Sequence, residues 1–140
     1  MKIAFDAKRI FTNYTGLGNY GRTLLSALMQ NYPEHDYVAY TPGIRDDLMQ
    51  QVEGAYHIKL PDTRWQKAWP SLWRSYGIAN DILRDRTDIF HGLSNEIPFG
   101  LAQRGIPTIV TIHDVIFRKH AEQYPALDRM LYHIKTAYAV

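Results

Sequence analysis

The stretch Pro107-Thr108-Ile109-Val110-Thr111-Ile112-His113-Asp114 decides how the rest of the chain is interpreted. Its unbroken run of β-branched and apolar residues predicts a strand buried on both faces of a parallel sheet. The strand delivers His113 and Asp114 to its C-terminal end, which is where an open α/β sheet binds ligands. A structural interpretation also fits, since Asp at a strand end commonly caps a turn and a lone His is usually satisfied by its neighbours.

The composition is that of a globular domain. The 140 residues are 46% hydrophobic and 21% charged, which predicts one domain over residues 1–140 with a core of its own. The net charge of +2 gives no indication of nucleic acid as a partner. The absence of cysteine excludes disulfides, thiolate nucleophiles and cysteine-ligated zinc. No segment approaches the about 20 apolar residues of a membrane span, so we expect a cytoplasmic protein, with peripheral contact at a membrane as a further expectation.

Apolar runs alternate with helical patterns along the chain. We expect strands over residues 2–7, 36–41, 55–60, 88–91 and 108–112. We expect helices from about residue 20 to 32, over 44–52, from about 70 to 84 and over 127–138, with Trp65 in the loop before the third. This alternation predicts an α/β, Rossmann-like fold with a mostly parallel sheet and helices on both faces. The last helical pattern has no stop signal before Val140, which fits either a natural terminus or a piece of a longer chain.

Three of the predicted strands end in polar loops, which a doubly wound sheet brings to one rim. The first loop contains Thr15-Gly16-Leu17-Gly18-Asn19-Tyr20, where the start of a helix offers unpaired N–H groups to a phosphate. It lies too far from the first strand for a dinucleotide fingerprint, it is not a P-loop, and its glycines fit a flexible start of a helix equally well. The second loop brings His91, Asn95 and Glu96 toward His113. The histidines lack the spacing of metal ligands, so we expect no metal ion.

Three tryptophans mark the basic segment between the third and fourth predicted strands. Trp65, Trp69 and Trp73 are spaced by four, with Lys67 and Arg74 beside them. A stripe of this kind usually packs a helix onto its own sheet, and we favour that interpretation over an exposed surface for a membrane or an acceptor.

Taken in order, these motifs resemble the N-terminal domain of GT-B-fold glycosyltransferases of family 4. The resemblance covers nearly the whole chain. It rests on Lys2-Ile3-Ala4-Phe5-Asp6-Ala7, Gly16-Leu17-Gly18-Asn19-Tyr20, Trp69-Pro70 before a basic helix, Asp88-Ile89-Phe90-His91-Gly92 and Val110-Thr111-Ile112-His113-Asp114. Such enzymes have two Rossmann-like domains with the active site between them, and the resemblance implies that the C-terminal, donor-binding domain is absent from these 140 residues.

The resemblance also implies roles for individual residues. Gly16, Gly18 and Asn19 correspond to the loop that approaches the donor diphosphate. His113 corresponds to the histidine that contacts the donor sugar near the reaction centre, and Asp114 supports its loop. The acceptor-side candidates are Arg9, Asn95 and Glu96. Members of the family often have Asp-Ala-Arg after the first strand, whereas Lys8 stands third here, which leaves open whether Lys8 or Arg9 faces the cleft.

The function implied is retaining transfer of a sugar from a nucleoside diphosphate sugar to a glycan or lipid-linked acceptor, in cell-surface polysaccharide biosynthesis. No metal and no cofactor beyond the donor substrate are expected, and residues 1–140 alone should be inactive. Two alternatives remain: a stand-alone flavodoxin-like binding or regulatory module for a phosphorylated ligand, and a sugar-nucleotide epimerase of similar architecture.

Overall fold

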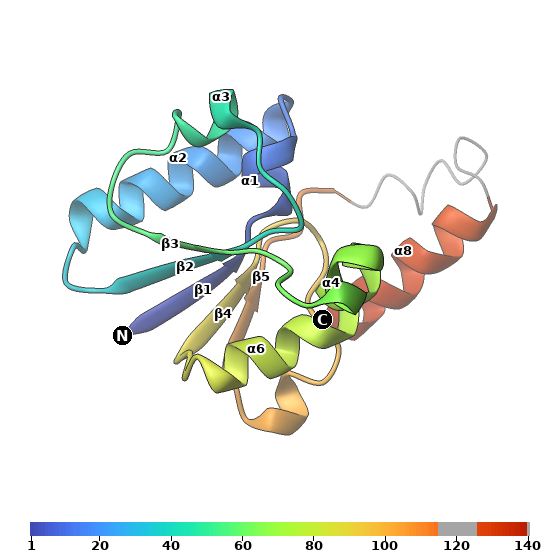
Figure 1. The fold of residues 1–140 in the computed structure, drawn as a ribbon. Helices are drawn as coiled ribbons and strands as arrows, with labels where there is room; N and C mark the ends of the chain where they lie inside the picture. Colours follow the sequence, from blue (N-terminus) through green and yellow to red (C-terminus); the bar gives the residue numbers. More distant parts are fainter. Residues whose placement is uncertain (115–125, 140) are drawn as a thin grey trace.

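The chain folds around a five-stranded sheet in which all strands are parallel. The computed structural model describes residues 1–114 and 126–139. The strands are β1 (Lys2–Asp6), β2 (Asp36–Tyr40), β3 (His57–Lys59), β4 (Ile89–Gly92) and β5 (Thr108–Val110), in the order β3-β2-β1-β4-β5 (Figure 1). The order reverses direction between β1 and β4. The predicted Rossmann-like α/β fold is confirmed.

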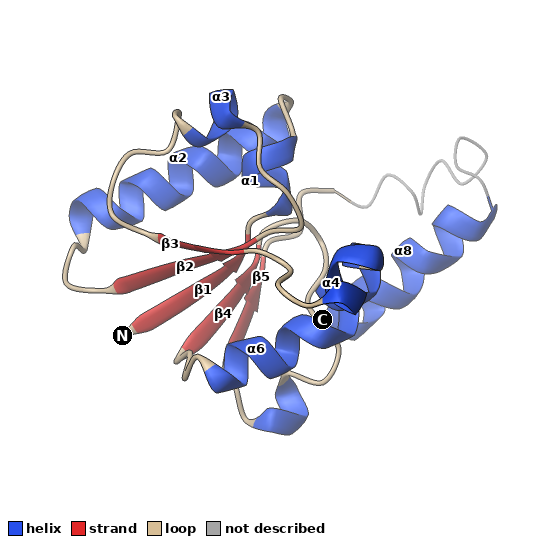
Figure 2. Ribbon diagram, in the orientation of Figure 1, coloured by secondary structure: helices blue, strands red, loops and turns tan. Residues whose placement is uncertain are grey.

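Helices cover both faces of the sheet (Figure 2). One face carries α1 (Lys8–Thr12), α2 (Gly16–Asn31) and α3 (Asp46–Met49). The other carries the segment made of α4 (Arg64–Ala68), α5 (Pro70–Leu72), the π-helical turn η1 (Trp73–Gly77) and α6 (Ile78–Arg84). A short 3-10 turn, η2 (Ala102–Arg104), precedes β5, and α8 (Ala126–Ala139) is the last described element. None of the helices in the described ranges has the length and apolar content needed to cross a bilayer.

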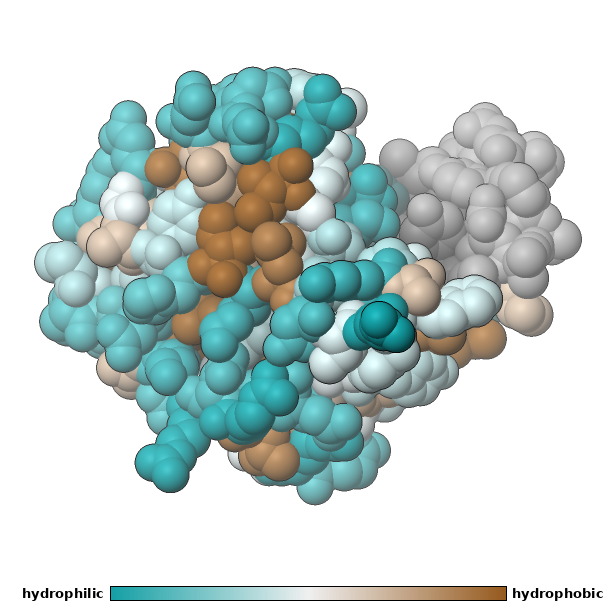
Figure 3. Space-filling model, in the orientation of Figure 1, coloured by the Kyte–Doolittle hydropathy of each residue, from teal (hydrophilic) through white to brown (hydrophobic). Residues whose placement is uncertain are grey.

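Alternation along the central strands builds two separate cores. In β1, Ala4 faces the core under α6, whereas Phe5 faces the core under α2. In β2, Val38 and Tyr37 divide in the same way. Both strands are buried on both sides, as their continuous apolar character predicts. On the face drawn in Figure 3, an apolar area lies between α3 and β3, elements that contain the partly buried Met49 and Ile58.

The strand that dominates the sequence pattern is the exception. β5 is an edge strand among the described residues, and Ile109 is 49% exposed. Ile112, just beyond the strand, is 36% exposed. The prediction of a strand buried on both faces is therefore wrong for β5. A β-branched run predicts extended backbone, but the topology decides how many neighbours a strand has.

The helical segment before β4 also differs from its prediction. Trp65 lies in α4 and not in a loop, because Thr63 and Gln66 form a capping box that starts a helix at Arg64. The single helix expected from Pro70 is helical to Arg84, but it contains the π-helical turn η1. The tryptophan stripe divides: Trp73 is buried, whereas Trp65 and Trp69 are exposed.

The loop expected between the first strand and the first helix is mostly helical. α1 occupies Lys8–Thr12, and α2 begins at Gly16, so that Gly16 and Gly18 belong to its first turn. α3 and β3 are shorter than expected, because their outer residues extend into turns.

Candidate functional site

The N-terminal turn of α2 is held against α1 by backbone contacts. The side chain of Arg22 donates to the carbonyl oxygens of Ile10 (2.7 Å) and Asn13 (3.0 Å). A Cβ at Gly18 would collide with the carbonyl oxygen of Asn13, so glycine allows this close approach. Three amides of the first turn, those of residues 16–18, are the donors that a helix N-terminus leaves without intrahelical partners.

Asn19 is engaged elsewhere. Its backbone N–H donates to Thr15 (3.1 Å), and its side-chain oxygen accepts from Arg22 (2.5 Å). Of the three residues that the resemblance assigns to a diphosphate, only Gly16 and Gly18 therefore contribute amides of the open turn.

His113 contacts α2 at Tyr20, which follows the open turn of residues 16–18. Its ring and that of Tyr20 of α2 form a T-shaped pair, with the ring centroids 4.9 Å apart and the planes at 86°. Its Nε2 is 2.8 Å from the carbonyl oxygen of Leu93. Since a carbonyl only accepts, we assign the hydrogen to Nε2, which makes Nδ1 of the neutral ring an acceptor. The side chain is half-buried, so a ligand at the rim reaches it while its orientation stays defined.

Asn95 clamps the backbone that carries His113. It adopts a left-handed conformation (φ 62°), which Asn tolerates better than most residues. Its backbone N–H donates to Thr111 (3.0 Å), its Oδ1 accepts from the His113 N–H (2.9 Å), and its Nδ2 donates to the Asp114 carbonyl (3.2 Å). Asn95 therefore joins the loop after β4 to the end of β5. Asp114 itself is exposed.

Thr111 connects the remaining groups of this site. Its hydroxyl lies 2.8 Å from Nε2 of His91 and 3.4 Å from the hydroxyl of Tyr20. Burial lowers the pKa of His91, which packs on Phe5 at 5.8 Å between ring centroids. The sequence gives no signal that Thr111 or Tyr20 belongs to a site, although both lie inside the stretches 107–114 and 15–20. We call His91, Asn95, Thr111, His113 and Tyr20 the histidine site.

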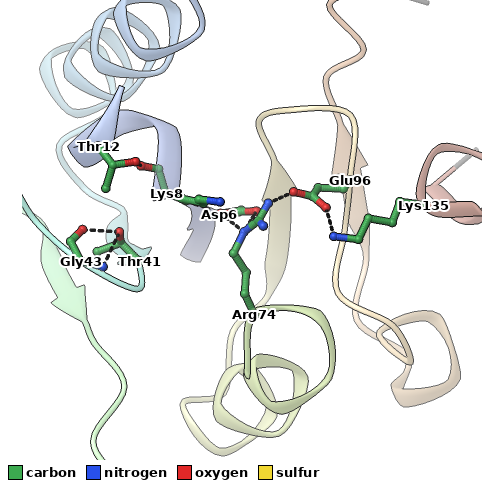
Figure 4. A network of polar contacts seen from close by, with 8 residues as sticks. All are labelled: Asp6, Lys8, Thr12, Thr41, Gly43, Arg74, Glu96 and Lys135. Atoms are coloured by element: carbon green, nitrogen blue, oxygen red, sulfur yellow. Dashed lines mark hydrogen bonds and ion pairs between the residues drawn. The ribbon is translucent and has the colours of Figure 1, made fainter. Parts of the chain in front are cut away.

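A second polar cluster lies where the strand order reverses, beyond the ends of β1 and β4 (Figure 4). Arg74 of η1 donates from Nε to Asp6 at the end of β1 (2.8 Å), and its Nη2 pairs with Glu96. The other carboxylate oxygen of Glu96 pairs with Lys135 of α8 (2.6 Å). Asp6, Arg74, Glu96 and Lys135 form what we call the ion chain.

The ion chain gives Glu96 two cationic partners and leaves it at the rim, next to Asn95. In the sequence Arg74 is part of a basic segment, and no spacing connects it with Asp6, 68 residues away. Lys8 reaches toward the same cluster in Figure 4, and its pKa is lowered because burial disfavours the ammonium and because Arg74 and Arg9 are also positive. Arg9 lies half-buried on α1. The structure thus places Lys8 beside the ion chain.

Within residues 1–114 and 126–139, no group of three or more His, Asp or Glu side chains could hold a metal ion. Comparisons of the chain with family models, with curated proteins and with solved structures gave no match. The fold and the rim define a Rossmann-like α/β domain in which a half-buried histidine after β5 contacts Tyr20 of the long helix α2.

Proposed function

We propose that this chain is the N-terminal, acceptor-side domain of a retaining glycosyltransferase of the GT-B type, acting on a nucleoside diphosphate sugar. One observation supports the proposal: Tyr20, which follows the open first turn of α2, contacts His113 beyond the end of β5, so that the start of this helix and the histidine lie on the same rim. The sequence motifs that resemble family 4 are the ones that form this point.

The chemistry of the site fits glycosyl transfer. Departure of a nucleoside diphosphate places negative charge on the leaving group, and the amides and partial positive charge of a helix N-terminus stabilise such charge. Nδ1 of His113 accepts a hydrogen bond from a sugar hydroxyl and so orients the sugar. Asn95 is a positioning residue, because it holds the His113 backbone.

The proposal includes a second domain that supplies the other wall of the cleft and most of the donor contacts. The acceptor, a glycan or a lipid-linked sugar of surface polysaccharide assembly, would lie on the side of Glu96 and Lys8. Residues 1–140 by themselves would not transfer sugar, because the donor is held from one side only.

Binding of nucleoside diphosphate to the chain tests the role of α2. Gly16 is the first residue of α2 and has open space around its Cα, so Gly16→Pro removes one amide donor at the helix position that proline tolerates best. Thr15 before it is extended (ψ −175°), which suits a following proline. We expect Gly16→Pro to weaken binding by roughly tenfold, since it removes one hydrogen bond to a charged group.

Gly16→Ala is the matched control, because it keeps the amide and should bind as the unchanged chain does. The measurement is a titration of the isotope-labelled chain with nucleoside diphosphate, monitored at the amides of residues 16–18. Equal binding by the two variants, or no amide shift with ligand at millimolar concentration, would refute the role of α2.

The role of His113 is tested in the protein that joins this domain to a donor-binding domain. We expect His113→Ala to lower kcat of sugar transfer by about a hundredfold, as removal of one positioned hydrogen-bonding group does. The free energy of unfolding should change little, since the ring is half-buried. Losses in activity and stability of similar size would mean that His113 is structural, and transfer by residues 1–140 alone would refute the two-domain proposal.

A stand-alone module for a phosphorylated ligand is the second candidate. It is favoured by the fact that this chain alone supplies the first turn of α2 together with Tyr20, Thr111 and His113, which contact one another through Tyr20. Tight binding of a phosphorylated compound that depends on the residue 16 amide, without any sugar transfer by a longer protein, would select it.

A further inference from the structure

The segment from α4 to η1 has two faces of opposite character. Its inner face carries Trp73, which is 1% exposed and donates from its indole to Asp81 (2.7 Å), and Arg74 of the ion chain. Its outer face carries Trp65 (49% exposed), Trp69 (63%), Leu72 (51%) and Tyr76 (58%). We call these four outer side chains the tryptophan surface.

Two side chains of the tryptophan surface, Trp65 and Tyr76, are held in place by packing. Trp65 lies over Gly77, where even a Cβ would collide with the indole. Tyr76 stacks on Phe99 at 5.0 Å, and Phe99 in turn meets Tyr138 of α8 at 4.6 Å. The capping box of Thr63 and Gln66 fixes the start of α4. Trp65 and Tyr76 are therefore presented to solvent without further ordering, which reduces the entropy that binding must overcome.

Basic side chains accompany the aromatic ones. Arg64 and Lys67 of α4 are both exposed, against one exposed acid, Asp62, just before the helix. In the described part of the chain, the indole N–H groups of Trp65 and Trp69 have no hydrogen-bond partner, in contrast with Trp73. Indole and phenol rings with a free polar group, next to Lys and Arg, match the region of lipid headgroups, where Trp and Tyr are enriched and anionic lipids attract cations.

We propose that the tryptophan surface docks this domain on the headgroup region of an anionic membrane, with Trp65, Trp69 and Tyr76 in the interface and Arg64 and Lys67 against lipid phosphates. The surface contains none of the residues of the histidine site, so the proposal does not depend on sugar transfer. Arg74 lies on the inner face of the same segment and pairs with Asp6. The docked surface would therefore be linked to the rim of the sheet through this ion pair.

The test is co-sedimentation of the chain with vesicles of phosphatidylglycerol and phosphatidylcholine, compared with vesicles of phosphatidylcholine alone. We expect binding to the anionic vesicles that weakens as salt is added, because the charges are at the surface. Tryptophan emission should shift to the blue on binding, since Trp65 and Trp69 leave water whereas Trp73 is already buried.

Two variants should reduce binding. Trp69→Ser should weaken it by about tenfold, the effect expected for one large side chain that leaves an apolar environment. Lys67→Gln should weaken it by about fivefold on anionic vesicles, the effect of one charge near the surface. Both positions are exposed, so neither variant should alter folding, which circular dichroism would check.

Matched controls lie at the opposite end of the strands, just before β2 and just before β4. Tyr32→Ser removes an exposed aromatic ring after α2, and Arg86→Gln removes an exposed charge before β4. Both should bind as the unchanged chain does. The proposal is overturned if no anionic vesicle binds, if the controls lose as much as the surface variants, or if Trp69→Ser instead abolishes self-association or binding of a soluble glycan.

Discussion

The histidine site and the ion chain lie on the same rim and contain similar numbers of polar groups. They differ in whether any of these groups remains accessible to a ligand. In the ion chain, Arg74 and Asp6 are 8% and 3% exposed and pair with each other. The cavity beside them is about 10 Å³, room for a single water. In the histidine site, His113 keeps one ring nitrogen and part of its ring at the surface.

The denser set of charges is therefore satisfied within the protein, whereas the proposed binding site has fewer charges and an accessible ring. An open α/β sheet binds ligands where the strand order reverses. Here that position is occupied by the protein's own charges, and the accessible group lies one strand farther along, at the end of β5. Buried ion pairs hold the fold together when complete and are costly when broken.

The largest expected effect is that of breaking the ion chain. Arg74→Met should lower the free energy of unfolding by about 3–5 kcal/mol, because it leaves the buried Asp6 carboxylate without its cation. The double variant Asp6→Asn with Arg74→Met should recover part of this loss, since no buried charge remains at β1. Urea denaturation measures the free energy of unfolding of both variants. If Arg74→Met lowers it no more than His113→Ala does, the ion chain is not more important for stability than the histidine site.

A smaller loss is expected from Gly18→Ala. The new Cβ must push against the carbonyl oxygen of Asn13, a backbone atom, and overpacking of this kind costs about 1–3 kcal/mol. Gly16→Ala is the control, because nothing lies within 4 Å of a Cβ there. Equal stability of the two variants in urea would show that the backbone between α1 and α2 can shift at little cost in free energy.

Asn95 shapes the histidine site in two ways, through its side-chain hydrogen bonds and through its positive φ. Asn95→Ala should cost about 1–2 kcal/mol, because it loses the side-chain bonds to His113 and Asp114 and strains a positive φ. Asn95→Gly loses the same bonds but relieves the strain, so it should be the more stable of the two. In both, the imidazole resonances of His113 should shift. Unchanged resonances would mean that Leu93 and Tyr20 suffice to orient the ring.

The smallest effect is a pH dependence from His91. Burial lowers its pKa in the folded state from the ordinary 6.5, so the unfolded chain takes up a proton first as the pH falls. The contribution of the neutral His91 ring to the free energy of unfolding is complete above pH 6.5. It decreases as the pH falls below this value, by at most about 1.4 kcal/mol per pH unit. His91→Gln should reduce the slope between pH 7 and 5, whereas His57→Gln, at an exposed position of β3, should keep it.

Much of the architecture was predictable from particular residues. The apolar runs around Phe5, Val38 and Phe90 predicted their strands, because buried strands need apolar residues. The stripe that begins at Leu127 predicted α8, although its residues Met130 and Ile134 are exposed. The convergence of the glycine turn, His91, Asn95 and His113 also followed, since parallel strands bring their C-terminal ends to one rim. The α1 helix was missed because Lys8–Thr12 is too short to show a helical period.

The sequence by itself determined the layered α/β fold and the rim where His113 meets the start of α2, because local periodicity and strand direction are encoded in neighbouring residues. Only the tertiary structure decided that β5 is an edge strand among the described residues and that Trp73 is buried while Trp65 and Trp69 are exposed. It also decided that Arg74 pairs with Asp6 and Glu96. These outcomes depend on contacts between residues far apart in the chain, and such contacts leave no spacing in the sequence from which they could be predicted.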